Sequence, residues 1–369
     1  MTNATDPSRR NHLGLIRGLL ALAFAFGVLS APAHAAGGGA GTGAKATTSS
    51  KNYDYYLTGS PVDATPAAPI TPMVVLMGGG VDVDDAFMSM IAKARNGGTG
   101  KVDIVIVRAS GADGYNPYLF AMDGVDSVET LVVKTRAGAD DSTVNAIVSR
   151  ADVLFIAGGD QWNYINLWKG SKLDATLQVL SARNVPMGGT SAGLAVLGAV
   201  DFSAENGTIT SDEATGNPYH RRLTLDAGFL NHLPYLAGTI ADPHLVTRDR
   251  MGRLLTFVAR MLKDGVVDLT SARAIGVDEQ TALVIDGGGA GTGTVMGVGA
   301  VYFLKPSIAA TTIVARTPLT FLGIGVYKLT ANTGTFAFGI WAPTGNVPLY
   351  NLDVVAGVLT SSQGGGSPY

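Results

Sequence analysis

Short apolar runs rich in Val and Ile alternate along the chain with longer mixed segments. The runs occupy residues 73–77, 102–107, 130–134, 153–157, 185–187, 274–277 and 282–285. Continuous apolar runs separated by helix-length spacers predict strands of a parallel sheet that is buried on both faces. The spacers at 84–96, 142–150 and 173–182 have the length and residue types of amphipathic helices. The pattern therefore predicts an α/β fold with helices on both faces of a parallel sheet.

The pattern changes after about Gly287. Residues 287–294 are all small, and apolar and polar positions then alternate, with many threonines and glycines, through 311–315, 324–329 and 335–341. Such alternation predicts antiparallel strands. We expect a catalytic α/β domain over 69–288 and a β-rich extension over 289–369 whose role is structural, covering an edge of the main sheet.

The amino terminus has the features of a signal peptide. Three arginines precede an apolar run at 19–29, and Ala33-His34-Ala35 supplies the small, spaced residues that a signal peptidase reads. The apolar run is shorter than the ~20 residues of a spanning helix, which argues against a retained anchor. We expect residues 1–35 to be removed before Ala36. The mature chain would then be periplasmic or secreted, with no membrane association.

Residues 36–68 are rich in Gly, Ala, Thr, Ser and Pro, which predicts a flexible linker.

Composition narrows the class of protein. The 369 residues are 46% hydrophobic and 15% charged, enough to bury a large core. A formal net charge of −3 gives no basic field for nucleic acid. The absence of cysteine excludes disulfides, thiolate metal sites and a cysteine nucleophile.

A serine in a glycine-flanked turn is the first candidate for chemistry. Gly189-Thr190-Ser191-Ala192-Gly193 follows the apolar run at 185–187 and precedes an alanine- and leucine-rich segment at 194–200. A strand, a sharp turn and a helix in this order expose a serine hydroxyl at the carboxyl end of a sheet, where α/β folds bind ligands. Ser191 is therefore a candidate nucleophile of a serine hydrolase. The alternative is an ordinary turn in a chain with 49 glycines.

A serine nucleophile needs a base, and the chain has five histidines. His12 and His34 lie in the expected signal peptide, which leaves His220, His232 and His244. His244 is favoured because it ends an apolar run and precedes a helix-like segment, a strand-end position comparable to that of the serine. The other two histidines resemble loop or packing residues.

The sequence constrains the acidic residue and the oxyanion hole of the predicted site less than it constrains the nucleophile and the base. Any carboxylate that reaches the far imidazole nitrogen of the base would fix its tautomer, and we favour Glu213, with Glu205 second. Backbone amides for an oxyanion hole are available at Ala192 and in the glycine run around Gly79, where glycine lets the backbone approach a substrate carbonyl. A simple tight turn is the alternative interpretation of that glycine run.

Four ordered motifs between about Met73 and Ile285 carry a family resemblance. They are Phe155-Ile156-Ala157-Gly158-Gly159-Asp160-Gln161, the Gly-Gly-Thr-Ser-Ala-Gly around Ser191, Asp242-Pro243-His244 followed by Arg248-Asp249-Arg250-Met251-Gly252-Arg253, and Gly276-Val277-Asp278-Glu279. Together they resemble the cyanophycinases, serine peptidases related to aspartyl dipeptidase. The resemblance implies a flavodoxin-like parallel sheet related to class I glutamine amidotransferases. It also implies that Ser191 is the nucleophile and His244 the base.

The resemblance also implies a substrate. Cyanophycin has a poly-aspartate backbone with arginine joined to each side-chain carboxyl, and enzymes of this family release β-aspartyl-arginine dipeptides without a metal or cofactor. Gln161 corresponds to a family residue that contacts substrate. Arg250 and Arg253, three residues apart on one helix face, are suited to hold a β-aspartyl carboxylate, with a solvated helix face as the alternative. Relatives with flat sheet edges often form homodimers.

Two acidic residues and one proline complete the comparison with the family. Asp278 and Glu279 could support the His244 loop or meet a substrate cation. The family usually has a polar residue where this chain has Pro243, which lacks both an N–H and a polar side chain. Another acidic or isoaspartyl peptide is therefore an alternative substrate. An esterase or lipase, and a non-catalytic exported binding protein, are the rival classes.

Overall fold

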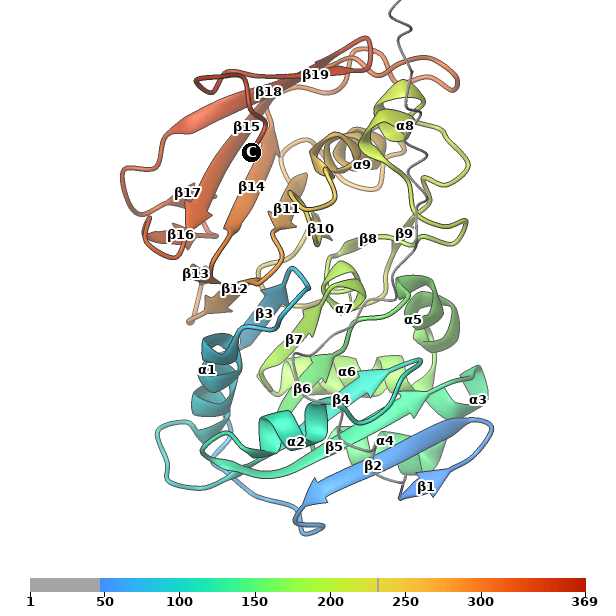
Figure 1. The fold of residues 1–369 in the computed structure, drawn as a ribbon, viewed down its shortest axis with the longest axis vertical. Coiled ribbons are helices and arrows are strands. Elements are labelled where there is room, and N and C mark those ends of the chain that lie inside the picture. The colour runs from blue at the N-terminus through green and yellow to red at the C-terminus, as the bar shows by residue number, and fades with distance from the viewer. Residues whose placement is uncertain (1–46, 231) are drawn as a thin grey trace, which may run out of the picture. The chain divides into compact units, whose positions relative to one another are not determined.

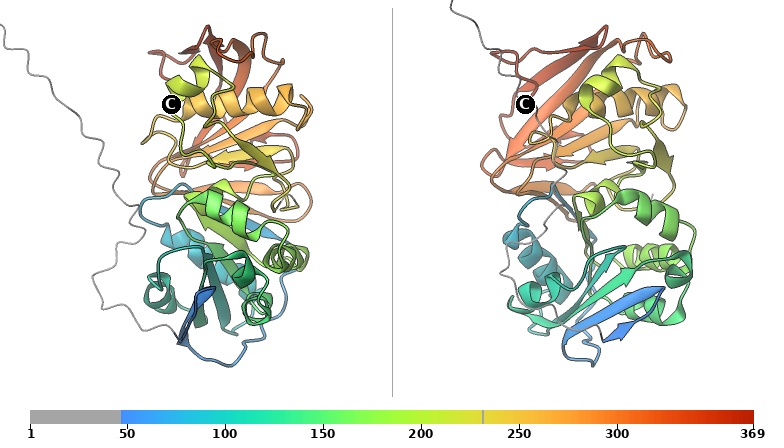
Figure 2. Two further views of the ribbon diagram at one scale, coloured as in Figure 1. Left: turned by 90° about the vertical axis from the view of Figure 1, so that its right-hand side faces the viewer. Right: turned by 45° about the vertical axis from the view of Figure 1, so that its right-hand side comes forward.

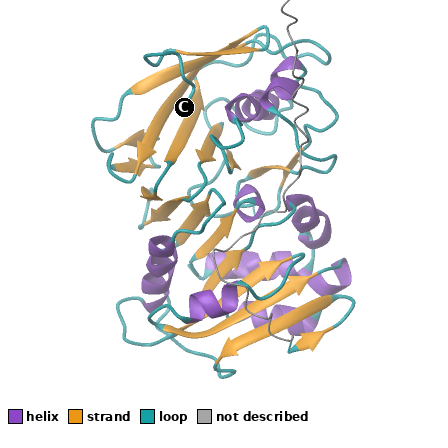
Figure 3. Cartoon of the chain, in the orientation of Figure 1, coloured by secondary structure: helices purple, strands orange, loops and turns teal. Residues whose placement is uncertain are grey.

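A computed structural model describes residues 47–230 and 232–369 of the chain (Figure 1). The expected signal peptide and its cleavage site lie outside these residues. The described part is a mixed α/β structure with two β-sheets and helices packed on them (Figure 3). Among the described residues, none of the helices combines the length and apolar character needed to span a bilayer.

The first sheet has eleven strands in the order β1-β2-β5-β4-β6-β7-β3-β12-β13-β16-β17. Its strands are β1 (Thr48–Ser49), β2 (Tyr53–Gly59), β3 (Met73–Met77), β4 (Val102–Arg108), β5 (Val125–Val133), β6 (Val153–Ile156), β7 (Met187–Thr190), β12 (Thr281–Asp286), β13 (Thr292–Gly297), β16 (Thr335–Ala337) and β17 (Ala342–Pro343).

The second sheet has eight strands in the order β19-β18-β15-β14-β11-β10-β8-β9. They are β8 (Val200–Phe202), β9 (Leu225–Ala227), β10 (Thr239–Asp242), β11 (Arg273–Val277), β14 (Ala300–Pro306), β15 (Phe321–Thr330), β18 (Leu349–Val355) and β19 (Val358–Ser361). The helices are α1 (Asp84–Arg95), α2 (Tyr115–Phe120), α3 (Arg136–Ala139), α4 (Ser142–Ser149), α5 (Gln161–Trp168), α6 (Lys172–Ala182), α7 (Ala192–Ala195), α8 (Ser211–Gly216) and α9 (Met251–Lys263).

Strands β5, β4, β6, β7 and β3 pair in parallel and form the centre of the first sheet. Alternate side chains of β4 enter different core clusters: Val105 packs with α4 and α6, and Ile104 packs with α1 and α2. Because successive residues of a strand point to opposite faces, a strand covered on both sides must be apolar throughout. This explains the continuous apolar runs, and Figure 2 shows the helices around these strands.

One expectation about the parallel sheet is wrong. The runs at 274–277 and 282–285 are strands, but β12 pairs antiparallel with β3, and β11 pairs in parallel with β10 in the second sheet. Only residues 278–280 connect β11 to β12. Two successive parallel strands of one sheet need a crossover of a dozen or more residues, so a connection this short excludes that arrangement. The run at 185–187 overlaps β7 only at Met187, because the rest of that strand consists of two glycines and a threonine.

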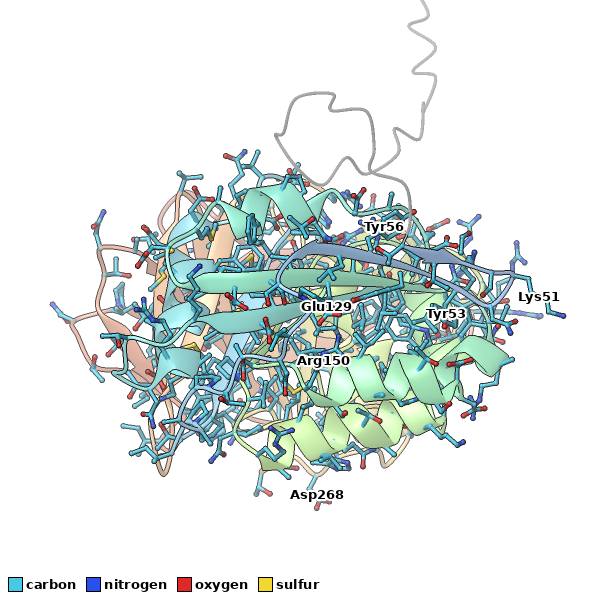
Figure 4. The ribbon with its side chains drawn as sticks, turned by 90° about the horizontal axis from the view of Figure 1, so that it is seen from below. Lys51, Tyr53, Tyr56, Glu129, Arg150 and Asp268 are labelled. Atoms are coloured by element: carbon cyan, nitrogen blue, oxygen red, sulfur yellow. The ribbon has the colours of Figure 1, made fainter. Side chains whose placement is uncertain are left out.

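The predicted linker of residues 36–68 is also corrected. Its described part contains β1 and β2, and β2 pairs antiparallel with β5 along its whole length. The Tyr55 hydroxyl donates to Glu129. Arg150 donates to the same carboxylate at 2.5 Å, and Figure 4 labels both Glu129 and Arg150. Three tyrosines in β2 supply the apolar area that the surrounding small residues lack. The segment thus adds an edge strand to the first sheet.

The strands after Gly287 are antiparallel, as the alternating pattern predicts. β13 continues the first sheet beyond β12, and β14, β15, β18 and β19 extend the second sheet beyond β11. One face of the second sheet packs on α9, whose residues Leu254, Leu255 and Val258 are fully buried. The carboxyl-terminal segment therefore shares both sheets with the rest of the described chain.

Candidate active site

Ser191 occupies a strained turn between β7 and α7. Its backbone has φ 53° and ψ −117°, which side-chain-bearing residues rarely adopt. A Cβ placed on Gly193 would lie 2.0 Å from the carbonyl oxygen of Ile156, and one on Gly189 would lie 2.5 Å from the carbonyl carbon of Gly193. Only glycine fits at either position. The small flanking residues therefore allow the turn that raises the serine hydroxyl above the sheet.

His244 lies beside this hydroxyl. It follows the end of β10 with φ 53°, and its backbone N–H donates to the Gly78 carbonyl at 2.9 Å. Its Nε2 is 2.7 Å from Ser191 Oγ, and the residue is only 3% exposed. The structure thus brings together the two residues that the sequence selects as nucleophile and base.

Glu279 completes a relay of hydrogen bonds behind the serine. Its Oε1 lies 2.6 Å from Nδ1 of His244. An ionised carboxylate can only accept, so Nδ1–H must be the donor. The neutral imidazole then presents Nε2 as an acceptor for the Ser191 hydroxyl. The three side chains are ordered for transfer of the serine proton to the histidine.

The expectation that Glu213 orients His244 is corrected by this geometry. Glu213 lies in the first turn of α8, where its side chain closes a capping box with Thr210 and pairs with Arg222 at 2.9 Å. Hydrogen bonds from Thr210 are the largest of the influences that lower the pKa of Glu213. Glu205, the second choice, is not the partner of Nδ1 either. Both expected acids precede His244 in the chain, whereas the observed acid follows it by 35 residues.

The surroundings keep His244 uncharged. Burial lowers the pKa of His244 well below its ordinary value, and the positive charges of Arg248, Arg250 and Arg253 lower that pKa further. Glu279 opposes this effect because it stabilises the imidazolium. A neutral imidazole is the form that can accept a proton, so the site holds its base ready at neutral pH.

A cavity of about 450 Å³ opens in front of Ser191 and His244. Its walls come from the start of α5, the elbow between β7 and α7, the loop after β8, and the turn between β10 and α9. The lining residues are Gly159, Asp160, Gln161, Ser191, Ala192, Phe202, Ala204, residues 207–210, Pro243, His244, Arg248, Arg250 and Arg253. Three arginines and one aspartate are the charged side chains of a lining that is otherwise mixed polar and apolar.

Arg253 differs from its expected role. Its guanidinium donates from Nε and Nη2 to the two oxygens of Asp242 at 2.8 and 2.5 Å, and from Nη1 to Thr208 at 3.1 Å. The residue is 1% exposed and its guanidinium lies over the Phe202 ring. A fork already occupied by a buried carboxylate is not free for a substrate carboxylate. Arg253 therefore ties α9 to β10 and the loop after β8.

Arg250 and Arg248 are the more accessible arginines of the cavity. Arg250 donates to the Pro243 carbonyl at 2.9 Å and lies 3.7 Å from Asp242, with 11% of its side chain exposed. The Arg248 side chain is 46% exposed and its Nε lies 3.9 Å from Glu279. Arg248 belongs to one of the four motifs, and its sequence context predicts no role for it. Its exposure makes it the cation best placed to meet a ligand carboxylate.

Gln161 and Asp160 line the cavity from the start of α5. Asp160 caps α5 by accepting from the Trp162 N–H at 3.0 Å, and it still lines the cavity. Gln161 donates to the Phe202 carbonyl at 3.2 Å. Gln161 thus lies in the cavity, as expected for a substrate contact, and it also supports the loop after β8.

The expected oxyanion donors lie on two sides of the catalytic pair. Ala192 directly follows the serine and lines the cavity together with Gly159, and Gly79 lies against the imidazole of His244. Gly79 has φ +96°, and a Cβ there would lie 2.2 Å from Cε1 of His244. Gly79 therefore provides room for the imidazole. Gly159 adds a glycine to the cavity wall beside Ala192.

The described residues offer no alternative metal centre: residues 47–230 and 232–369 contain no cluster of three or more His, Cys, Asp or Glu that could hold a metal ion. His220 accepts through Nδ1 from the Arg222 N–H at 3.3 Å, which is a local loop contact.

The fold and site define the class of a serine hydrolase with a Ser-His-Glu relay.

Comparison with known proteins agrees with this class. The model of peptidase family S51 matches residues 119–292. The cyanophycinases of Synechococcus elongatus and Thermosynechococcus vestitus are each 30% identical over 190 residues, which is 51% of this chain and 52% of theirs. The cyanophycinase of Nostoc sp. is 27% identical over 51% of this chain and 57% of its own. The chain thus spans about half the length of the curated relatives it matches.

A crystal structure of a peptidase from an acI-B1 Actinobacterium aligns with a TM-score of 0.47 and 17% identity, covering 72% of this chain and 97% of that one. The family match and the curated relatives confirm the resemblance that the four motifs indicate. The chain is similar to the serine-type peptidases of family S51, and specifically to cyanophycinases.

Proposed function

We propose that this chain is a serine-type peptidase that hydrolyses cyanophycin to β-aspartyl-arginine dipeptides through an acyl-enzyme on Ser191. The observation that carries the proposal is the Ser191–His244–Glu279 relay, which opens on a cavity with accessible arginines. The similarity to cyanophycinases supports the choice of substrate. No cofactor is part of the proposal.

The chemistry begins with proton transfer from Ser191 Oγ to Nε2 of His244 while Oγ attacks a backbone carbonyl carbon of the polymer. The amides of Ala192 and Gly159 stabilise the oxyanion, and Glu279 stabilises the imidazolium. His244 then donates its Nε2 proton to the leaving amine. A water molecule, deprotonated by the same nitrogen, hydrolyses the ester and restores the Ser191 hydroxyl.

The cavity suggests how the substrate is oriented. A β-aspartyl-arginine unit carries a carboxylate and a guanidinium. Arg248 and Arg250 offer positive charge on one wall, and Asp160 offers a carboxylate on another. We assign the substrate carboxylate to Arg248 and Arg250, and the substrate guanidinium to Asp160. Gln161 and Arg253 then shape the walls between them.

Three broader features belong to the same proposal. The parallel strands with helices on both faces support a flavodoxin-like core related to class I glutamine amidotransferases. Export to the periplasm or the outside rests on the signal-like residues 1–35. An exported enzyme would degrade polymer released by other cells, and the enzyme could do so as a monomer or homodimer.

The experiment is to incubate a cyanophycin suspension with the wild-type chain and with Ser191→Ala, and to identify soluble products by mass spectrometry. The expected result is β-aspartyl-arginine with the wild type alone. Faster hydrolysis of p-nitrophenyl esters than of any β-aspartyl peptide would favour an esterase. Binding of polymer without turnover, and without labelling of Ser191 by a fluorophosphonate, would favour a binding protein. Turnover of a different isoaspartyl peptide alone would point to Pro243 as the basis of the changed specificity.

A further inference from the structure

Tyr369 contacts the turn that carries the cavity arginines, although it lies 120 residues further along the chain. Its hydroxyl donates to Asp249 Oδ1 at 2.7 Å and accepts from the Met251 N–H at 3.1 Å. Its ring packs edge-on against Tyr302 of β14, with 6.1 Å between the ring centroids. The tyrosine thus bridges the antiparallel part of the second sheet and the start of α9.

This contact replaces a helix cap. The first amides of a helix have no partner within the helix, and Arg250, which precedes α9, provides no side-chain cap. The Tyr369 hydroxyl accepts from Met251, and the Ser211 hydroxyl accepts from the Arg253 N–H at 3.2 Å. Two side chains from elsewhere in the chain therefore complete the first turn of α9.

The capped turn is strained. Asp249 has φ 45°, a conformation that persists only where the surroundings hold it. Its carbonyl accepts from the Ser211 hydroxyl at 2.5 Å, while its carboxylate accepts from Tyr369. These two contacts fix Asp249 from both sides.

The same turn reaches the base. Arg248 and Arg250 flank Asp249, and both line the cavity. Arg250 donates to the carbonyl of Pro243, the residue before His244. A shift of Asp249 would therefore move both arginines within the cavity.

Tyr369 is itself held in place. The Tyr350 hydroxyl on β18 donates to the Pro368 carbonyl at 3.0 Å, and Gln363 Nε2 donates to the Ser367 carbonyl at 3.0 Å. The first bond joins residues 363–369 to the second sheet and the second closes this segment on itself, so the Tyr369 ring is held in position beside the turn.

We propose that Tyr369 is a positioning residue for substrate binding. It fixes Asp249 and the first turn of α9, so that Arg248 and Arg250 are held ready for a substrate carboxylate. The inference rests on the proposed function for the identity of the substrate. It gives the β-rich carboxyl-terminal segment a role in the site, beyond the purely structural one expected from its sequence.

The first test compares Tyr369→Phe with Tyr327→Phe during cyanophycin hydrolysis. Each variant loses one tyrosine hydroxyl, but among the described residues that of Tyr327, in β15, makes no hydrogen bond that supports this turn. We expect Tyr369→Phe to raise KM about five- to tenfold, within the range of one lost hydrogen bond, and to change kcat less than about twofold. Equal KM values for the two variants would overturn the proposal.

A second substitution separates positioning from general stability. If Tyr369 acts through the arginine turn, the KM effect of Tyr369→Phe should largely vanish in an Arg248→Ala background. Independent effects that multiply would instead show that Tyr369 does not act through Arg248, and would overturn the proposal.

Hydrogen exchange makes the two proposals distinguishable because it needs no substrate. Amides of residues 246–253 should exchange faster in Tyr369→Phe than in the wild type or Tyr327→Phe. If wild-type protein leaves cyanophycin intact, the proposed function fails, while faster exchange would still support Tyr369 as the residue that holds this turn. Unchanged exchange would overturn the inference even if the polymer is cleaved.

Discussion

The carboxylate of Glu279 lies 2.6 Å from Nδ1 of His244, and this contact fixes which nitrogen of the imidazole faces Ser191. Glu279 belongs to the short connection between β11 and β12, where the chain passes from the second sheet to the first. His244 follows β10, which is the parallel neighbour of β11. Adjacent strands of one sheet therefore deliver the base and its acid to the same edge.

Replacing Glu279 by glutamine should remove the group that fixes the tautomer and stabilises the imidazolium. We expect kcat to fall on the order of 10³–10⁴-fold in Glu279→Gln, with little change in melting temperature. Glu213→Gln is the matched control and should keep near-normal turnover, because that side chain pairs with Arg222. A comparable loss in both variants would contradict the assignment.

The arginines of the cavity should separate into binding and structural groups. Arg248→Ala should raise KM about tenfold with little effect on stability, since its side chain is 46% exposed. Arg253→Met should destabilise the protein by about 3–5 kcal/mol, because it leaves Asp242 buried without its partner. Thermal unfolding and steady-state kinetics of the two variants test this division. Equal losses of stability would show that it is wrong.

Gly79 should be essential for the space that His244 occupies. In Gly79→Ala the new Cβ would lie 2.2 Å from the imidazole, so we expect activity to fall at least on the order of 10²-fold. Gly265→Ala has the same need for a positive φ but nothing within 4 Å of its Cβ. It should lose about 1 kcal/mol of stability and keep its activity. Full activity of Gly79→Ala would contradict the packing described.

The pH dependence follows from the lowered pKa of His244. Because burial and three arginines favour the neutral imidazole, the acid limb of kcat/KM should lie below pH 6.5, the ordinary value for histidine. Arg248→Ala removes one positive charge and should move that limb to higher pH. Arg222→Ala, next to Glu213, should leave it in place. An acid limb at or above pH 6.5 in the wild type would refute this account of the base.

The sequence predicts the parallel strands and the main helices well because their signals are local. The apolar run at 73–77 coincides with β3, and the helix expected at 84–96 ends one residue from α1. The linker prediction failed at β2, because composition averaged over 36–68 hides the tyrosines that pack on β5. The parallel interpretation of β12 failed because sheet direction depends on connection length as well as on apolarity.

The site was predicted unevenly for a physical reason. Ser191 lies in a local motif, and His244 could be selected because few histidines remain once the signal peptide is set aside. The acid has no local signature, since only the meeting of β10 and β11 brings Glu279 to the imidazole. Arg253 has the helical spacing of a surface residue, yet its fork is occupied by Asp242. Spacing along a helix does not reveal a buried partner from another element.

The most direct test of the central claim is the rate at which a fluorophosphonate labels Ser191, followed by peptide mass spectrometry. The account predicts one adduct, on Ser191, with labelling slowed on the order of 10²-fold or more in Glu279→Gln and unchanged in Glu213→Gln. Labelling at another residue, or equal rates in Glu279→Gln and the wild type, would contradict the relay of Ser191, His244 and Glu279.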